Sequence, residues 1–475
     1  MTAQELDKET YRRIIEEYFR AFETHDFSNV RFSTQIEFLS PISGITIQGR
    51  EEVGRFLSGV STRVTAVNVI AIAVDFPTAS GVWQMTTTKG VQYTLHNFFR
   101  LDGEGLLYIW PMFDPKAVMD DPPGLLQWLT GNGYYQVAAT TPKQLAGVTI
   151  SKTGRIFVNS PRWVDEPTPS VAEIAADGSL VPYPNEAINA WDQTPGESAR
   201  DHFVSVQSVV VVDEEDALWI LDPASPGPPS SYFRAVVPGG AKLVRVDLAT
   251  NEVTRVYHFD DESAPVKSYF NDVRFARGHA FISDSGLGAI VVVDLDTGKV
   301  RRLLEDHASP KVEPGVEPVI GGQPWKLPNG RPPEVHVDGI AIDPQREHVY
   351  YKPLVGQTLY RIPIAALLDE SLPSEAVGER VERVAETEPT DGLEFDAQGN
   401  LYLTSLEWNA IKVLRPDGRI ELVARSTDFQ WPDTIAMSRD GDLLLSCAQF
   451  HLLPDFNGGE DKRTPPYKVF RLKLP

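Results

Sequence analysis

Apolar residues near the N-terminus recur with helical spacing. They fall at i, i+3 and i+4 intervals, which places them on one face of an amphipathic helix: Tyr11, Ile14, Ile15, Tyr18, Phe19 and Phe22. The stretch "GREEVGRFLSGV" predicts a second short helix, and three β-rich runs follow up to about residue 118. Helices followed by long antiparallel strands predict an α+β domain over residues 1–118.

From about residue 143 the pattern changes to short apolar strands separated by tight turns. Six similar runs follow one another: "LAGVTISKTGRIFVN", "VQSVVVVDEEDALWILD", "FNDVRFARGHAFISD", "VDGIAIDPQREHVYYKP", "TDGLEFDAQGNLYLTS" and "PDTIAMSRDGDLLLSC". Each run reads as a polar or small pair, an alternating strand, a turn and a second apolar strand. Further strand pairs, such as "AIVVVDLDTGKVRRLLE", lie between several of them.

Six repeats of about four strands each predict a six-bladed β-propeller over residues 143–475. The chain is therefore expected to be mainly β, with an N-terminal α+β domain and a Pro/Gly-containing linker at 119–142. The last strand, "YKVFRLKLP", is expected to complete the sixth blade, and "YYQVAAT" to close the ring. Closing the ring protects strand edges that would otherwise pair with other chains.

The start of each innermost strand should face the mouth of the central channel. In the alignment of the repeats, these positions are Ala146, Gln207, Asn271, Asp338, Asp391 and Asp433. Carboxylates that converge on one axis repel one another unless a cation or protons neutralise them, and oxygen ligands suit Ca²⁺ or Mg²⁺. The alternative is structural, because Asp before Gly is a common turn residue.

The second region resembles the yellow/major royal jelly protein family. The resemblance rests on "GVTISKTGRIFVNSPRW", "VSVQSVVVVDEEDALWILD", "YFNDVRFARGHAFISDSGLGAIVVVDLDTGKVRRLLEDHAS" and "HVDGIAID". A more distant resemblance, to the SMP-30/gluconolactonase family, implies a divalent metal at the channel, with Asn271, Asp338 and Asp391 as ligands. Ala146 stands where that family has a metal-binding Glu, so the implied ligand set is incomplete.

The first region resembles the NTF2-like (SnoaL-like) family, in which a curved sheet and helices surround a cone-shaped pocket. The resemblance rests on the first helix, "FETHDFSNV", "IQGREEVGRFL" and "HNFFRLDGEGLLYIWPMFDP". It implies an acid or base inside the cone, and the matching residues are His96 and Asp114. The alternative is a binding or dimerisation module without chemistry. A dimerisation module would join two chains as a homodimer.

Several other side chains are candidates for the channel site. His336 lies two residues before Asp338, so both should leave the strand on one side, and a His is a natural general base. Asp391 is the second catalytic candidate. The expected ligand contacts are Gln207, Asp272, Asp433 and Trp325, the last as an aromatic wall carried by "GGQPWKLPNGRPP". Each candidate has an alternative. His336 could be a structural residue, Arg274 could simply balance the charge of Asp272, and the segment that carries Trp325 could be a disordered surface loop.

Composition narrows the function classes. The net charge of −22 disfavours nucleic acid and anionic membranes as partners. The single Cys447 excludes an intrachain disulfide, and the N-terminus lacks the apolar core of a signal peptide, so we expect a cytoplasmic protein. The sequence has neither a Walker motif nor a G-x-G-x-x-G after a strand, so no nucleotide cofactor is expected.

These observations favour an enzyme that acts on a small organic molecule in the propeller channel. The expected chemistry is metal-assisted hydrolysis of a lactone or ester, or isomerisation of an oxygenated ring compound. Two alternatives stay open: a propeller that binds an aromatic or terpenoid ligand without turnover, and catalysis in the N-terminal cone.

Overall fold

The computed structural model describes residues 6–39, 46–88, 90, 92–112, 134–163, 169–227 and 235–474. They form two compact units, an N-terminal one and a larger one, and the division falls at Tyr134 and Tyr135, the first residues of strand β7 (Tyr134–Thr141) of the larger unit. None of the helices among these residues has the length and apolar character of a membrane span.

The N-terminal unit is an α+β domain, as its sequence pattern predicts. Its sheet has the strand order β2-β1-β6-β5-β4-β3. The elements are α1 (Lys8–Thr24), β1 (Phe32–Leu39), β2 (Thr46–Gln48), α2 (Arg50–Ser61), β3 (Val64–Asp75), β4 (Thr78–Thr87), β5 (Gln92–Leu101) and β6 (Leu106–Met112). Helix α1 begins after Asp7, whose carboxylate accepts a hydrogen bond from the Thr10 amide at 2.7 Å. Its apolar face is buried, and the Phe19 ring lies 5.1 Å from that of Trp83.

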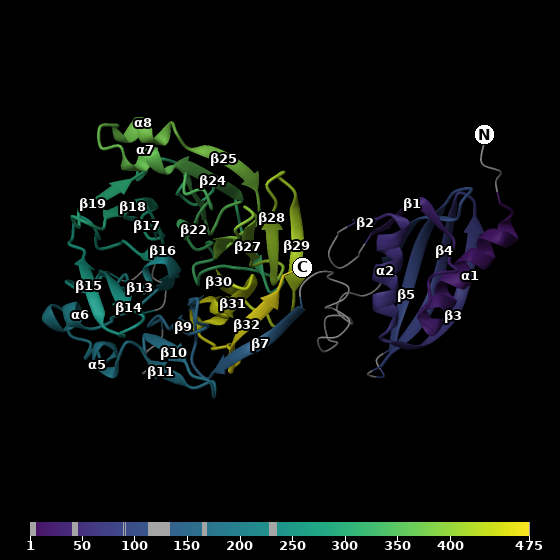
Figure 1. Ribbon diagram of the computed structural model, residues 1–475, viewed down its shortest axis with the longest axis horizontal. Helices are drawn as coiled ribbons and strands as arrows, with labels where there is room; N and C mark the ends of the chain where they lie inside the picture. Colours follow the sequence, from purple (N-terminus) through teal and green to yellow (C-terminus); the bar gives the residue numbers. More distant parts are fainter. Residues whose placement is uncertain are drawn as a thin grey trace. The chain divides into compact units, whose positions relative to one another are not determined.

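The larger unit is a six-bladed propeller, with six four-stranded sheets around a common axis (Figure 1). Blades one and two contain β8 (Val148–Ile150), β9 (Ile156–Asn159), β10 (Val171–Ile174) and β11 (Leu180–Pro182), then β12 (Ser208–Val212), β13 (Ala217–Asp222), β14 (Lys242–Asp247) and β15 (Val253–His258). Blades three and four contain β16 (Phe270–Ala276), β17 (His279–Asp284), β18 (Ala289–Asp294) and β19 (Val300–Leu303), then β22 (Val337–Ile342), β23 (His348–Pro353), β24 (Thr358–Pro363) and β25 (Glu382–Glu386). Blades five and six contain β26 (Leu393–Phe395), β27 (Leu401–Ser405), β28 (Ala410–Leu414) and β29 (Ile420–Arg425), then β30 (Pro432–Met437), β31 (Asp442–Cys447), β32 (Tyr467–Lys473) and β7 (Tyr134–Thr141).

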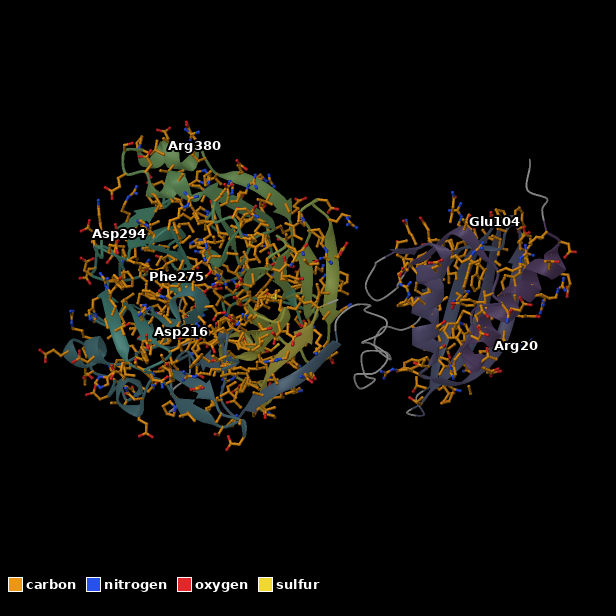
Figure 2. All side chains as sticks on the ribbon, in the orientation of Figure 1. Arg20, Glu104, Asp216, Phe275, Asp294 and Arg380 are labelled. Atoms are coloured by element: carbon orange, nitrogen blue, oxygen red, sulfur yellow. The ribbon has the colours of Figure 1, made fainter. Side chains whose placement is uncertain are left out.

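The blade order agrees with the six repeats in the sequence, and the short insertions lie between them. The described residues of the propeller include four short α-helices. Two lie between blades one and two, α5 (Glu186–Asn189) and α6 (Glu197–Asp201), and two lie between β24 and β25 of blade four, α7 (Ile364–Leu368) and α8 (Ser374–Gly378). The segment expected either to cover the mouth or to be disordered carries a small hairpin of β20 (Val319–Ile320) and β21 (Gln323–Pro324). Asp216 lies in the turn before β13, and Asp294 is the last residue of β18 (Figure 2).

Strand β7 closes the ring. It forms the fourth strand of the sixth blade beside β32, as expected for "YYQVAAT". The expected linker at 119–142 therefore extends too far, because 134–141 belong to the propeller. The reason is physical, since an unpaired β32 would leave an open edge in the last blade.

Polar side chains at or near the ends of second strands connect adjacent blades. The Asn159 amide donates to the Val206 carbonyl at 3.0 Å, and the Ser283 hydroxyl donates to the Asp338 carbonyl at 2.6 Å. The Ser446 hydroxyl donates in the same way to the carbonyl of Ala146, which joins the last blade to the first. These bonds fix the starts of neighbouring inner strands and so position the residues around the axis.

Candidate functional site

The predicted mouth residues converge on one cavity at the propeller axis. Five of the six positions line it: Gln207, Asn271, Asp338, Asp391 and Asp433. Ala146, the sixth, is fully buried in the apolar cluster that surrounds the cavity. The register of the repeats therefore predicted the geometry of this site correctly.

Close packing of the inner strands brings these residues together. A Cβ atom on Gly339 would lie 2.3 Å from the Asp391 carbonyl oxygen, and one on Gly392 would lie 2.4 Å from that of Asp433. Neither glycine has the positive φ that a tight turn would require. The two Asp-Gly pairs are thus points of close approach between blades, and the structural alternative of a turn is wrong for them.

Amide side chains tie the carboxylates to the rest of the site. Asn271 Nδ2 donates to Asp338 Oδ2 at 2.8 Å and to the Ser285 hydroxyl at 3.0 Å. Gln207 accepts a hydrogen bond from the Tyr269 hydroxyl at 2.6 Å. Ser285 belongs to the "SDSG" turn, whose second residue, Asp284, caps backbone amides nearby and has no place at the cavity.

Asp338 and Asp391 form a carboxyl pair. Their side chains lie close enough to hydrogen-bond when one of them is protonated, and Trp431 Nε1 donates to Asp391 Oδ2 at 2.7 Å. Burial raises the pKa of both carboxyl groups well above the usual range, and neighbouring carboxylates add to the effect. Burial and the charge of Asp391 likewise raise the pKa of Asp433. The pair resembles two carboxyls that share one proton because both cannot ionise at close range.

Asp272 was expected to contact a ligand, but it does not line the cavity. Its carboxylate pairs with Arg274 at 2.7 Å and accepts the Ser208 hydroxyl at 2.7 Å. The expectation was wrong because neighbouring strand residues point to opposite sides, and Asn271 takes the cavity side. Arg274 is the counter-charge that the sequence suggested. Burial lowers the pKa of its guanidinium, but the carboxylates of Asp272 and Glu394 outweigh this effect, so the pKa is raised.

His336 also lies away from the cavity. Its Nδ1 atom accepts a hydrogen bond from the Val312 amide at 3.0 Å, so the ring holds a loop in place. Burial lowers the pKa of this imidazole, and the positive charge of Lys311 lowers it further. The strand alternation used to place it beside Asp338 fails because β22 begins at Val337 and contains a register shift between Val337 and Ile340.

Aromatic side chains cover the carboxyl groups. Trp325 lines the cavity as expected, and the sequence did not identify the other members of this aromatic roof: Trp163, Tyr269, Trp431 and Phe450. Tyr269 and Trp431 each stand two residues before a mouth position, a recurrence that could have identified them. Among the described residues, the buried Trp325 Nε1 has no hydrogen-bond partner. A ligand oxygen could therefore accept a bond there.

The cavity has a volume of about 40 Å³, enough for water or an ion but not for a ring compound. A divalent cation would find two carboxylates and the oxygen of Asn271, which are ligands of the type that Ca²⁺ accepts. The described part of the chain contains no group of three His, Cys, Asp or Glu side chains that could hold a metal. The oxygen atoms around the cavity are therefore of the chemical type that binds a divalent cation, but the protein would supply few of the ligands.

The N-terminal unit contains a second, apolar cavity. It has a volume of about 30 Å³. Three of its lining side chains are linked by hydrogen bonds: Asn97 accepts one from Trp83 Nε1 at 2.8 Å and donates one to the Tyr18 hydroxyl at 3.2 Å. The His96 side chain is exposed on the opposite face of β5, so its expected place in the cone is wrong. Asp114 lies outside the described residues.

Comparison with known proteins supports the two-part division of the chain. The profile of the major royal jelly protein family matches residues 204–452. Residues 6–134 match a domain of unknown function, DUF4904, so the NTF2-like resemblance stays a prediction. A search among curated proteins gave no match.

Solved propeller structures are similar at low sequence identity. A gluconolactonase from Xanthomonas campestris is 11% identical, with 73% of this chain and 90% of that chain covered and a TM-score of 0.43. Virginiamycin B lyase from Staphylococcus aureus is 13% identical, with 72% and 100% covered and a TM-score of 0.41. A PQQ-bound aldose sugar dehydrogenase from Streptomyces coelicolor is 12% identical, with 72% and 98% covered and a TM-score of 0.43. At these sequence identities and TM-scores, the structural similarity supports no inference about the activity of this chain.

Proposed function

This chain belongs to the major royal jelly protein family, and we propose that its propeller acts on a small oxygenated organic molecule at the axial cavity. The proposed reaction is hydrolysis of a lactone or ester, or isomerisation of an oxygenated ring compound. The observation that carries the proposal is the buried, hydrogen-bonded carboxyl pair of Asp338 and Asp391, which faces the cavity.

In this proposal the pair supplies both general acid and general base. In this mechanism Asp391 holds the shared proton and protonates a carbonyl or ring oxygen of the substrate. Asp338 then takes a proton from water in hydrolysis or from carbon in isomerisation. Trp325 Nε1 donates a hydrogen bond to the substrate oxygen. Because the cavity is small, Trp325 and Phe450 must shift for a ring compound to enter.

A second candidate is cation-assisted chemistry at the same place, supported by the excess of negative charge. Three carboxyl groups line the cavity, and none of its lining residues among the described part of the chain is a Lys, Arg or His. Asn271, Asp338 and Asp391 would hold the ion, which would polarise a substrate carbonyl.

The test compares the full chain with Asp338→Asn and Asp391→Asn against a panel of lactones and aryl esters. We expect each substitution to lower kcat/KM by at least about 100-fold, the usual contribution of a general acid or base. Asp343→Asn is the matched control, because Asp343 lies in the same hairpin as Asp338 but caps a turn beside His348.

Activity that survives both substitutions in folded protein would refute the carboxyl-pair mechanism. Activity that is lost on chelation and restored by Ca²⁺ or Mg²⁺ would favour the cation-assisted candidate. A compound that binds at the axis and is recovered unchanged would favour a binding function.

A further inference from the structure

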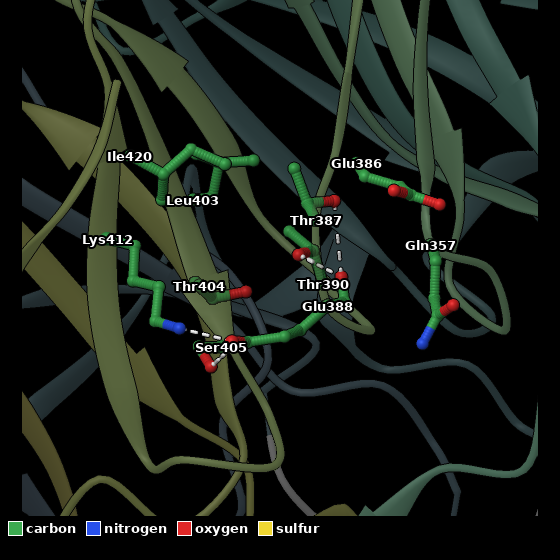
Figure 3. Close-up of a pocket in the computed structure, with 10 residues that line it drawn as sticks. All are labelled: Gln357, Glu386, Thr387, Glu388, Thr390, Leu403, Thr404, Ser405, Lys412 and Ile420. Atoms are coloured by element: carbon green, nitrogen blue, oxygen red, sulfur yellow. Dashed lines mark hydrogen bonds and ion pairs between the residues drawn. The ribbon is translucent and has the colours of Figure 1, made fainter. Parts of the chain in front are cut away.

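A second, open groove lies between blades four and five, and it is lined by β25 of blade four and by β27, β28 and β29 of blade five. Its volume is about 390 Å³, in the range of small-molecule sites. It shares no lining residue with the axial cavity. The lining residues are Gln357, Glu386, Thr387, Glu388, Thr390, Leu403, Thr404, Ser405, Lys412 and Ile420 (Figure 3).

A fixed carboxylate forms the centre of the groove. The two carboxylate oxygens of Glu388 contact Lys412 Nζ and the Ser405 hydroxyl (Figure 3). The Glu388 and Lys412 side chains are 26% and 20% exposed, so the pair is accessible from the groove although it is held in place. Such a pair offers a ligand both a hydrogen-bond acceptor and a donor.

The floor of the groove is also held in place. Thr404 Oγ1 accepts the backbone amides of Asp391 and Gly392, each at 3.0 Å. The Thr390 hydroxyl donates to the Glu388 carbonyl at 2.8 Å. Both threonines are buried, so these bonds fix the shape of the groove wall before any ligand arrives, which lowers the cost of binding.

The rim opposite Lys412 holds two polar side chains that the protein itself does not use. Gln357 and Glu386 are both exposed (Figure 3). In the described part of the chain, neither the side-chain amide of Gln357 nor the Glu386 carboxylate forms a hydrogen bond or ion pair. The backbone amide of Gln357 donates to Glu313. The amide can donate and accept, and the carboxylate can accept.

The chemistry of the lining narrows the ligand class. Two carboxylates against one ammonium group disfavour an anion, and the central Lys412 disfavours a cation. Only Leu403 and Ile420 are apolar, which disfavours a hydrophobic compound. Hydroxyl, carboxylate, amide and ammonium groups arranged around one groove match a ligand that carries several neutral hydroxyl groups.

We propose that this groove is a binding site for a neutral polyhydroxylated compound, such as a mono- or disaccharide. Hydroxyl groups of the ligand donate to Glu386 and to Glu388 and accept from Lys412 and Gln357. The proposal is independent of the reaction at the propeller axis.

Ligand-observed NMR titration of the full chain with D-glucose and maltose tests the proposal. Gluconate, choline and cyclohexanol represent the anionic, cationic and apolar classes. We expect saturable binding of glucose or maltose in roughly the millimolar range, and weaker binding of the other three compounds.

The decisive variant is Glu386→Gln, because this exposed carboxylate has no partner within the described residues and its loss should leave the fold intact. We expect about tenfold weaker sugar binding, the usual effect of losing one hydrogen bond to a charged group. Glu388→Gln should weaken binding further. The matched control is Glu382→Gln on the same strand, where Glu382 pairs with Arg361 outside the groove.

Three outcomes would overturn the proposal. The first is the absence of saturable sugar binding. The second is tighter binding of gluconate, choline or cyclohexanol. The third is sugar binding that Asp391→Asn abolishes while Glu386→Gln and Glu388→Gln leave it unchanged, because that sugar would occupy the axial cavity.

Discussion

Lys352 carries an amine that the fold removes from water. Its side chain lies at the end of β23 and is fully buried, with Nζ donating to the Gly356 carbonyl at 3.1 Å, to the Thr387 hydroxyl at 2.8 Å and to the Glu388 carbonyl. Burial lowers the pKa of this amine to about 7, although nearby carboxylates oppose the shift. The charged form of Lys352 therefore destabilises the folded state at neutral pH.

This depressed pKa predicts a specific pH dependence of stability. Between about pH 7 and pH 10 the unfolded chain holds the Lys352 proton and the folded chain releases it, so the free energy of unfolding rises with pH. The expected slope is about 1 kcal/mol per pH unit, and Lys352→Met should lack it. Urea unfolding followed by tryptophan fluorescence measures both profiles. Lys299→Met, which removes an exposed ion pair, should keep the slope of the unmodified chain, and parallel profiles for Lys352→Met would contradict the argument.

Whether the position of a site residue was predicted correctly depended on the sequence pattern used to predict it. Repeat register located Asn271, Asp338 and Asp391 correctly, because blades related by the same topology bring equivalent positions to the axis. Strand alternation misplaced His336, because the residue precedes its strand and a register shift follows. Of the aromatic roof only Trp325 was predicted, because its members lie outside the repeated strands, where position depends on tertiary packing.

Blade-to-blade packing at the axis depends on glycine at two inner-strand positions. Gly339 and Gly392 each lie against the carbonyl oxygen of a mouth residue in the next blade. This contact sets the spacing between inner strands, and so the distance between the carboxyl groups that they carry.

Gly339→Ala should therefore force blades four and five apart. The added Cβ would lie 2.3 Å from the Asp391 carbonyl oxygen, a backbone atom that cannot rotate away. We expect a loss of about 1–3 kcal/mol in the free energy of unfolding, as for overpacked cores. The matched control is Gly54→Ala in α2, where a Cβ atom would meet nothing within 4 Å and helix propensity should give a small gain. Equal stability of Gly339→Ala and the unmodified chain would show that the blades can separate without cost.

The sequence predicted the strands and blades more completely than it predicted the positions of individual site residues. Alternating apolar strands and tight turns identified all six blades, because each buries the same faces against its neighbours. The groove between blades four and five was not foreseen. Its residues come from β25, β27, β28, β29, the segment before β26 and the residue before β24, and only the contact between the folded blades brings them together.

At the scale of the whole propeller, closure joins distant parts of the chain. Strand β7 pairs beside β32, so the first strand of the unit completes the last blade. The Tyr135 ring packs 5.0 Å from Phe429 and 5.8 Å from Phe470. The Ser446 hydroxyl adds a second closing contact at Ala146. The ring is thus held at its seam both by an outer strand and by a bond beside the axial cavity.

Two truncated chains test the role of the outer strand. A chain that starts at residue 134 keeps β7, whereas one that starts at residue 143 loses it and exposes the edge of β32. We expect the longer chain to be monodisperse and to unfold cooperatively. The shorter one should unfold at a lower temperature and form oligomers, because an unpaired edge strand pairs with other chains. Size-exclusion chromatography with light scattering and thermal unfolding measure the difference. Identical behaviour of the two chains would mean that the Ser446 contact and inner-strand packing close the ring without β7.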